Sequence, residues 1–116
     1  MAKMHLQEKN DTLILAVQGP LSILDAPALR GCFLEAASSL RDLRLDLTGV
    51  EAIDLACVQV ICAAHRTYFG RGAGISLMGE VPGGVLRTVA VLGLTPGACT
   101  GRPHGVCLWD AGGNHE

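Results

Sequence analysis

The chain has 116 residues, a formal net charge of −2 and a charged fraction of 17%, which fits one globular domain with its own hydrophobic core. This charge balance argues against the basic face that binds nucleic acids and against the polybasic patch of a membrane-surface protein. The aromatic fraction of 3% leaves too few rings for stacking on bases.

The sequence also predicts where the protein works and how far its domain extends. Its apolar runs are shorter than the ~20 residues of a membrane span, and its start lacks a signal-peptide pattern, so we expect a cytoplasmic protein without direct membrane insertion. We expect one domain over 1–116, with a core at about 4–110 and a flexible tail at 111–116. The five cysteines contain no CxxC pair, which favours reduced, mostly buried thiols over a disulfide framework or a zinc site.

The N-terminal third predicts a strand pair followed by a helix. Residues 3–8 and 12–18 have strand patterns on either side of the turn pair Asn10-Asp11. A helix is expected over 26–39, with Asp25 as its N-cap and a proline in its first turn. The first two strands are therefore expected to form a hairpin at one side of a sheet.

The rest of the chain alternates between strand and helix signals. Leucines alternate with polar residues over 43–47, and a helical stripe covers 55–69. A short strand is expected at 75–78, a helix at 83–93 and a last strand at 106–109. This order predicts an α/β fold with a mixed sheet of four or five strands and helices packed mainly on one face.

Three stretches together resemble the STAS domain family, which includes anti-sigma factor antagonists and the tails of sulfate transporters. They are LAVQGPL at 15–21, LDLTGV followed by AID at 45–54, and GISLMG followed by VLRTVAVLGL at 74–94. The resemblance implies a STAS-like fold and a non-enzymatic bacterial module for signal transduction and transcription regulation. Its implied partner is an anti-sigma factor, a related kinase or another signalling protein, with no cofactor and no nucleic acid.

The family's switch motif differs in this chain. The usual pattern resembles Asp-Ser-Ser-Gly, in which the partner kinase phosphorylates the first serine. Here the sequence reads Asp54-Leu55-Ala56-Cys57, so phosphorylation of a serine at this position is chemically impossible. The resemblance implies a partner surface made of these four residues together with the loop that carries Ser22 and Asp25.

Several of these residues have a structural interpretation beside the functional one. Asp54 is a helix N-cap, an anchor at the partner surface or both, and the cap is favoured; a phosphoacceptor is a third, less favoured option. Cys57 is either a thiol activated in the first turn of a helix or a small buried residue, and burial is favoured. Cys62 and His65 share a helix face, where a buried pair is favoured over a nucleophile and its base.

Other functions remain open at this stage. STAS domains also serve as accessory subunits of membrane transport systems for lipids or anions, which would make a transport ATPase the partner. An enzyme using Cys57 or His65 would need a pocket that opens these side chains to solvent. The scattered histidines predict no metal site, and the glycines form no phosphate-binding pattern. A homodimer is also compatible with the sequence.

Overall fold

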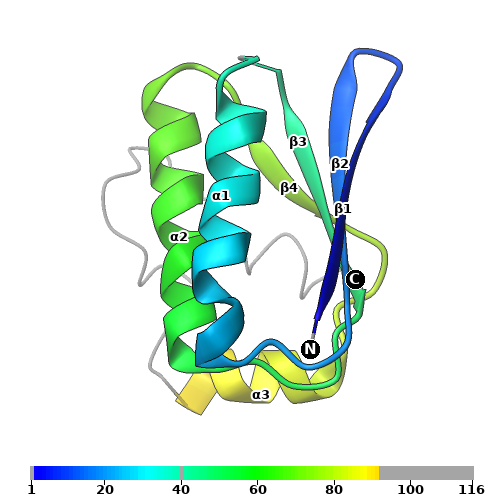
Figure 1. The fold of residues 1–116 in the computed structure, drawn as a ribbon, viewed down its shortest axis with the longest axis vertical. Coiled ribbons are helices and arrows are strands. Elements are labelled where there is room, and N and C mark those ends of the chain that lie inside the picture. Colours follow the sequence, from blue (N-terminus) through cyan, green and yellow to red (C-terminus); the bar gives the residue numbers. More distant parts are fainter. Residues whose placement is uncertain (1, 40, 92–116) are drawn as a thin grey trace.

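The computed structural model describes residues 2–39 and 41–91, which form a four-stranded sheet, one short 3-10 helix and three α-helices. Figure 1 shows these elements, which in chain order are β1 (Lys3–Lys9), β2 (Thr12–Gln18), η1 (Ile23–Asp25), α1 (Ala26–Ala37), β3 (Leu43–Gly49), α2 (Leu55–Gly70), β4 (Ile75–Met78) and α3 (Gly83–Val91). The strand expected at 106–109 and the tail expected at 111–116 lie outside the described residues.

The sheet is mixed, as the sequence predicts. Its strand order is β1-β2-β3-β4, with β1 antiparallel to β2 and the other neighbours parallel. The hairpin between β1 and β2 turns at Asn10 and Asp11, whose φ angles are 52° and 68°. Two-residue hairpin turns of type I′ need positive φ at both central residues, and Asn and Asp tolerate it. The predicted hairpin is therefore confirmed.

The core lies between the sheet and the pair α1 and α2, which run side by side along one face (Figure 1). In β3, Leu43, Leu45 and Leu47 are buried while Arg44 between them is exposed. The buried side chains of the helices are mainly apolar and include Leu29 and Phe33 of α1 and Val58, Ile61 and Cys62 of α2. The expected packing of helices mainly on one face is confirmed.

The third helix crosses the end of the molecule where α1 and α2 begin (Figure 1). Val85 and Val89 of α3 belong to the same core as the sheet. A Cβ atom on Gly84 would lie 3.0 Å from the carbonyl oxygen of Glu51, so a residue without a side chain suits this close approach. Helix α3 thus lies against the connection between β3 and α2.

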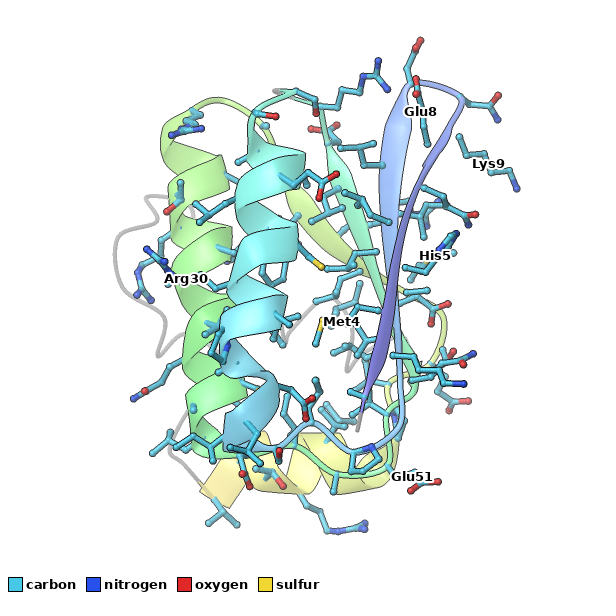
Figure 2. The ribbon with its side chains drawn as sticks, in the orientation of Figure 1. Met4, His5, Glu8, Lys9, Arg30 and Glu51 are labelled. Atoms are coloured by element: carbon cyan, nitrogen blue, oxygen red, sulfur yellow. The ribbon has the colours of Figure 1, made fainter. Side chains whose placement is uncertain are left out.

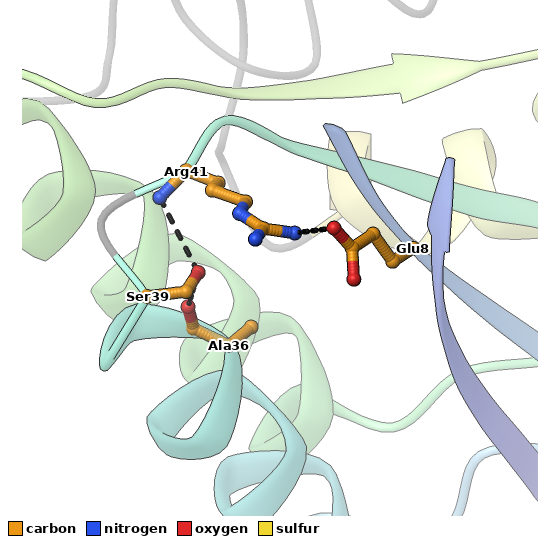
Figure 3. Close-up of polar contacts among 4 residues, drawn as sticks. All are labelled: Glu8, Ala36, Ser39 and Arg41. Carbon is orange, nitrogen blue, oxygen red and sulfur yellow. Dashed lines mark hydrogen bonds and ion pairs between the residues drawn. The ribbon is translucent and has the colours of Figure 1, made fainter. Parts of the chain in front are cut away.

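The opposite end of the molecule carries polar surface contacts. Arg41 forms an ion pair with Glu8, and its N–H donates to Ser39 Oγ at 3.3 Å (Figure 3). The Ser39 hydroxyl in turn donates to the carbonyl of Ala36 at 2.9 Å. Both charged side chains are partly exposed, and such pairs contribute little to stability. Side chains of strand β1 alternate between the two faces of the sheet. Met4 points toward the helices and is half-buried, whereas His5 points away from them and is exposed (Figure 2).

Candidate partner-binding site

Two connections lie side by side at the end where α1 and α2 begin. The N–H of Leu21 donates to the carbonyl of Ala52, and the N–H of Asp54 donates to the carbonyl of Leu21, both at 2.9 Å. Leu21 and Ile53 also form an isolated parallel bridge. The two loops are therefore joined by backbone hydrogen bonds beyond the ends of β2 and β3.

Asp54 links these loops through its side chain. Its carboxylate accepts the N–H of Ile23 at 2.9 Å, an amide in the first turn of η1. Its backbone carbonyl accepts the N–H groups of Cys57 and Val58 at 3.0 and 3.1 Å, which closes the first turn of α2. Asp54 does stand at the start of α2, as the sequence predicts. Its side chain, however, binds the N–H of Ile23 in the neighbouring loop, whereas the sequence favoured a side chain that caps α2.

The predicted side-chain cap at Asp25 is wrong. Asp25 precedes α1, but its carboxylate makes no hydrogen bond to the first turn of that helix. Instead Asp25 Oδ2 accepts the N–H of Ser22 at 2.9 Å and the hydroxyl of Ser22 at 3.1 Å. Ser22 Oγ accepts the N–H of Leu24 at 3.2 Å, which completes a capping box on η1. The carboxylate of Asp25 is therefore bound by Ser22 and not by the first turn of α1.

The surroundings of Asp25 stabilise its charged form. The N–H of Ser22 is the main cause that holds the pKa of the Asp25 carboxyl below its usual value, and burial opposes this effect. Only 3% of the residue is exposed. The buried Asp25 side chain therefore holds the turn at Ser22 by hydrogen bonds and is not exposed to a partner. This corrects its expected place on the partner surface.

Cys57 also lies beneath the surface. It is 0% exposed, and its S–H donates to the carbonyl of Ser22 at 3.2 Å. Burial, followed by the charges of Asp25 and Asp54, raises the pKa of the Cys57 thiol. A protonated, enclosed thiol is a poor nucleophile. The favoured interpretation as a small buried residue is confirmed, and the expected place of Cys57 on the partner surface is wrong because α2 turns it inward.

The exposed part of this end is largely apolar. Ile23, Leu24 and Leu55 are 64%, 76% and 47% exposed, and they stand on the two segments that the exposed Asp54 joins. We call these four residues the loop surface. Ala56, also expected at the partner surface, is half-buried beside it.

Sequence reasoning placed the loop that contains Ile23 and Leu24 in the interface but did not single out these side chains. The available signal was the spacing of Ser22 and Asp25, which is that of a capping box. In this chain the two residues between the members of the box, Ile23 and Leu24, are exposed.

The remaining candidate residues do not form an open catalytic site among the described residues. Cys62 is 8% exposed and His65 is half-buried within α2. Within residues 2–39 and 41–91, no group of three or more His, Cys, Asp and Glu side chains is placed to hold a metal ion. No helix in this part of the chain is long and apolar enough to cross a membrane.

The fold defines a small α/β domain of the kind seen in anti-sigma factor antagonists. A family model described as "Mlab, STAS domain" matches residues 4–96. The chain belongs to the STAS domain family, as the resemblance implied. No curated protein matches the sequence.

Several solved structures share this fold. An anti-sigma factor antagonist from Mycobacterium paratuberculosis has a TM-score of 0.71 at 19% identity, covering 81% of this chain and 80% of that one. A putative anti-sigma factor antagonist from Thermotoga maritima has a TM-score of 0.67 at 20% identity, covering 78% and 79%. The unphosphorylated anti-sigma factor antagonist SpoIIAA has a TM-score of 0.63 at 13% identity, covering 81% and 84%. At these identities the similarity shows the shared fold.

Proposed function

We propose that this chain is a non-enzymatic, cytoplasmic regulatory module of a bacterial signalling circuit, and that it binds an anti-sigma factor, a related kinase or another signalling protein. The observation that carries the proposal is the loop surface, where three exposed apolar side chains stand on the two segments that the Asp54 carboxylate joins. Burial of apolar side chains is the dominant favourable term in most protein–protein association, and a charge nearby gives specificity. Membership of the STAS family and the similarity in fold to anti-sigma factor antagonists support this choice.

We further propose that binding is not switched by phosphorylation at this surface. Residues 53–58 contain no hydroxyl group, and Leu55 stands directly after Asp54, where the family's acceptor serine is expected. A phosphate would add close to two negative charges at the start of α2. The apolar Leu55 adds exposed apolar area instead, which suits a stable complex.

A photo-crosslinking experiment tests the proposal. A photoreactive amino acid is placed at position 24 and, as a control, at position 34, whose leucine is 57% exposed on α1 and outside the loop surface. In source cells we expect position 24 to capture a signalling protein that position 34 does not capture. Capture of a transport ATPase would support the alternative function as an accessory subunit of a transport system. The lack of a hydroxyl acceptor in residues 53–58 is also compatible with this alternative.

Matched charge variants then locate the interface on the purified pair. Leu24→Glu should weaken binding by about 2 kcal/mol or more, because it buries an unpaired carboxylate in an apolar contact. Leu34→Glu should leave binding unchanged, and both variants should keep their stability within about 0.5 kcal/mol because both sites are exposed. Unchanged affinity of a folded Leu24→Glu variant would contradict the proposed interface. Phosphate found by mass spectrometry on residues 53–58 would contradict the absence of a switch.

A further inference from the structure

Large apolar side chains that are exposed gather at one end of the molecule. The side chains that the structure describes include five of this kind. Ile23, Leu24 and Leu55 belong to the loop surface, Val91 lies in the last turn of α3, and Leu34 stands apart on α1. Helix α3 crosses the end where α1 and α2 begin, and its last turn lies below the start of α2 in Figure 1. Four of the five therefore lie at this end, and such a gathering marks an interaction site.

The outer face of α3 adds a positive charge to this end. Val85 and Val89 are buried in the core, whereas Arg87 and Val91 are exposed. Arg87 and Val91 are four positions apart, so they share the face of α3 that points away from the core. We call the loop surface together with Arg87 and Val91 the end surface.

The end surface carries two opposite charges without an ionic partner in the described part of the chain. The one ion pair among the described residues lies at the opposite end of the molecule (Figure 3). Asp54 is exposed at the start of α2, and Arg87 is exposed on α3. A Cβ atom on Gly84 would lie 3.0 Å from the carbonyl oxygen of Glu51 and 3.8 Å from Arg87 Nη2. The guanidinium therefore lies beside the connection that leads to Asp54, and both charges are available to a second molecule.

The size of this end suits one occupant at a time. The molecule measures 34 × 32 × 25 Å along its principal axes, and the end surface lies across the longest of them (Figure 1). The area bounded by the two shorter axes is on the order of the 800 Å² that one protein buries in a standard interface. A second molecule that covers the end surface therefore also covers the loop surface.

We propose that two copies of this chain associate through the end surface about a twofold axis. In such an interface residue i of one copy meets residue j of the other and j meets i, so Asp54 of each copy pairs with Arg87 of the other. The apolar side chains are buried between the copies, and the exclusion of water strengthens the two charge pairs.

This association regulates the proposed function and rests on it, because the dimer hides the loop surface that binds the signalling protein. Only the monomer is then active. Residues 53–58 contain no hydroxyl group for a phosphate, so the concentration of the chain sets the fraction that is available for binding.

Sedimentation velocity of the purified chain over a range of concentrations tests the association. A reducing agent is present throughout, because a disulfide between two of the cysteines would also link two copies. We expect a reversible equilibrium between monomer and dimer with a roughly micromolar Kd. A chain that stays monomeric at about 0.5 mM would assign the end surface to the signalling protein alone and overturn the proposal.

A double-mutant cycle tests the charge pairs. Arg87→Gln and Asp54→Asn each remove one charge, and the amide oxygen of Asn can still accept the N–H of Ile23. Each variant should raise the Kd of the dimer at least about fivefold, and the double variant should raise it little further because the same pairs are already lost. Added salt should weaken the dimer of the unchanged chain more than that of Arg87→Gln. Fully additive effects would contradict the pairing.

Two exposed positions separate the end surface from other apolar contacts. Val91→Glu should raise the Kd of the dimer roughly tenfold or more, because the change acts twice in a twofold interface and buries unpaired carboxylates. Leu34→Glu, on α1 outside the end surface, should leave the Kd unchanged. Equal effects of the two changes would overturn the proposed interface.

The regulation is tested in source cells with the photoreactive amino acid at position 24. Arg87→Gln should increase capture of the signalling protein, since more of the chain is monomeric, and unchanged or reduced capture would contradict the competition. The proposed function fails separately: a chain that dimerises but captures no signalling protein refutes that function, whereas a strictly monomeric chain that captures one refutes only the association.

Discussion

Replacing Cys57 with alanine removes a sulfur atom from the point where α2 meets the loop before α1. The side chain is 0% exposed, and the sulfur is similar in size to a methylene group, whose burial contributes about 0.8 kcal/mol. The vacated space adds a cavity penalty because the surroundings relax only partly. The S–H is a weak donor, and the carbonyl of Ser22 keeps the N–H of Asp25 at 2.9 Å as a partner. We therefore expect Cys57→Ala to lower the free energy of unfolding by about 1–2 kcal/mol.

Urea denaturation followed by circular dichroism measures this loss. Cys32→Ala is the matched control, because Cys32 is half-buried and its sulfur contacts the sulfur of Met4 at 4.0 Å. The control should lose less than Cys57→Ala, with the same dependence on urea in both variants. A loss below about 0.5 kcal/mol for Cys57→Ala, or equal losses in the two variants, would refute the enclosed position of the thiol.

Three further outcomes are expected from the local chemistry. The pKa of the Asp25 carboxyl is lowered, so the stability that its charged form contributes is present above the unfolded pKa of about 3.9 and is lost as pH falls through the folded pKa. The urea midpoint of Asp25→Asn should therefore depend less on pH between roughly pH 5 and 2 than that of the unchanged protein. The pKa of the Cys57 thiol is raised, so the stability that its protonated form contributes is present below about pH 8.5 and is lost as pH rises through the folded pKa. The free energy of unfolding of Cys57→Ala should therefore fall less at alkaline pH than that of the unchanged protein. Gly79 has a φ of 75°, and a Cβ atom there would lie 2.7 Å from Thr48 Cγ2. Thermal melts of Gly79→Ala should therefore show a free energy of unfolding that is lower by about 1–3 kcal/mol. The control Gly31→Ala, which adds a methyl group in open space within α1, should raise it by up to about 1 kcal/mol.

The order of the elements could be predicted from the sequence because each has a strong local signal. The leucines of β3 alternate with period two, and Asn10 and Asp11 suit a turn with positive φ. Pro82 and the valines after it predicted α3, whose buried positions are Val85 and Val89. Burial patterns and turn residues act over a few positions, so a single sequence carries them in full.

The details of the candidate site depend on contacts between separate segments. Asp25 satisfied the rule for a helix cap, but the nearby Ser22 competes for its carboxylate. Asp54 binds the N–H of Ile23, which is 31 positions earlier in the chain, and no local rule predicts such a partner. Cys57 faces inward because α2 packs against the loop of Ser22. These outcomes required the arrangement of the two loops in space.

The hydrogen bonds between the two loops also determine how this end of the molecule responds to binding. Leu21 exchanges backbone contacts with the segment before α2, and Asp54 binds both segments. Amide hydrogens at these positions should therefore exchange with solvent only when the parallel strands open as well, in one cooperative event. A partner then meets a preorganised surface and loses little affinity to loop ordering. Changes in affinity among variants of the loop surface should consequently appear in the dissociation rate more than in the association rate.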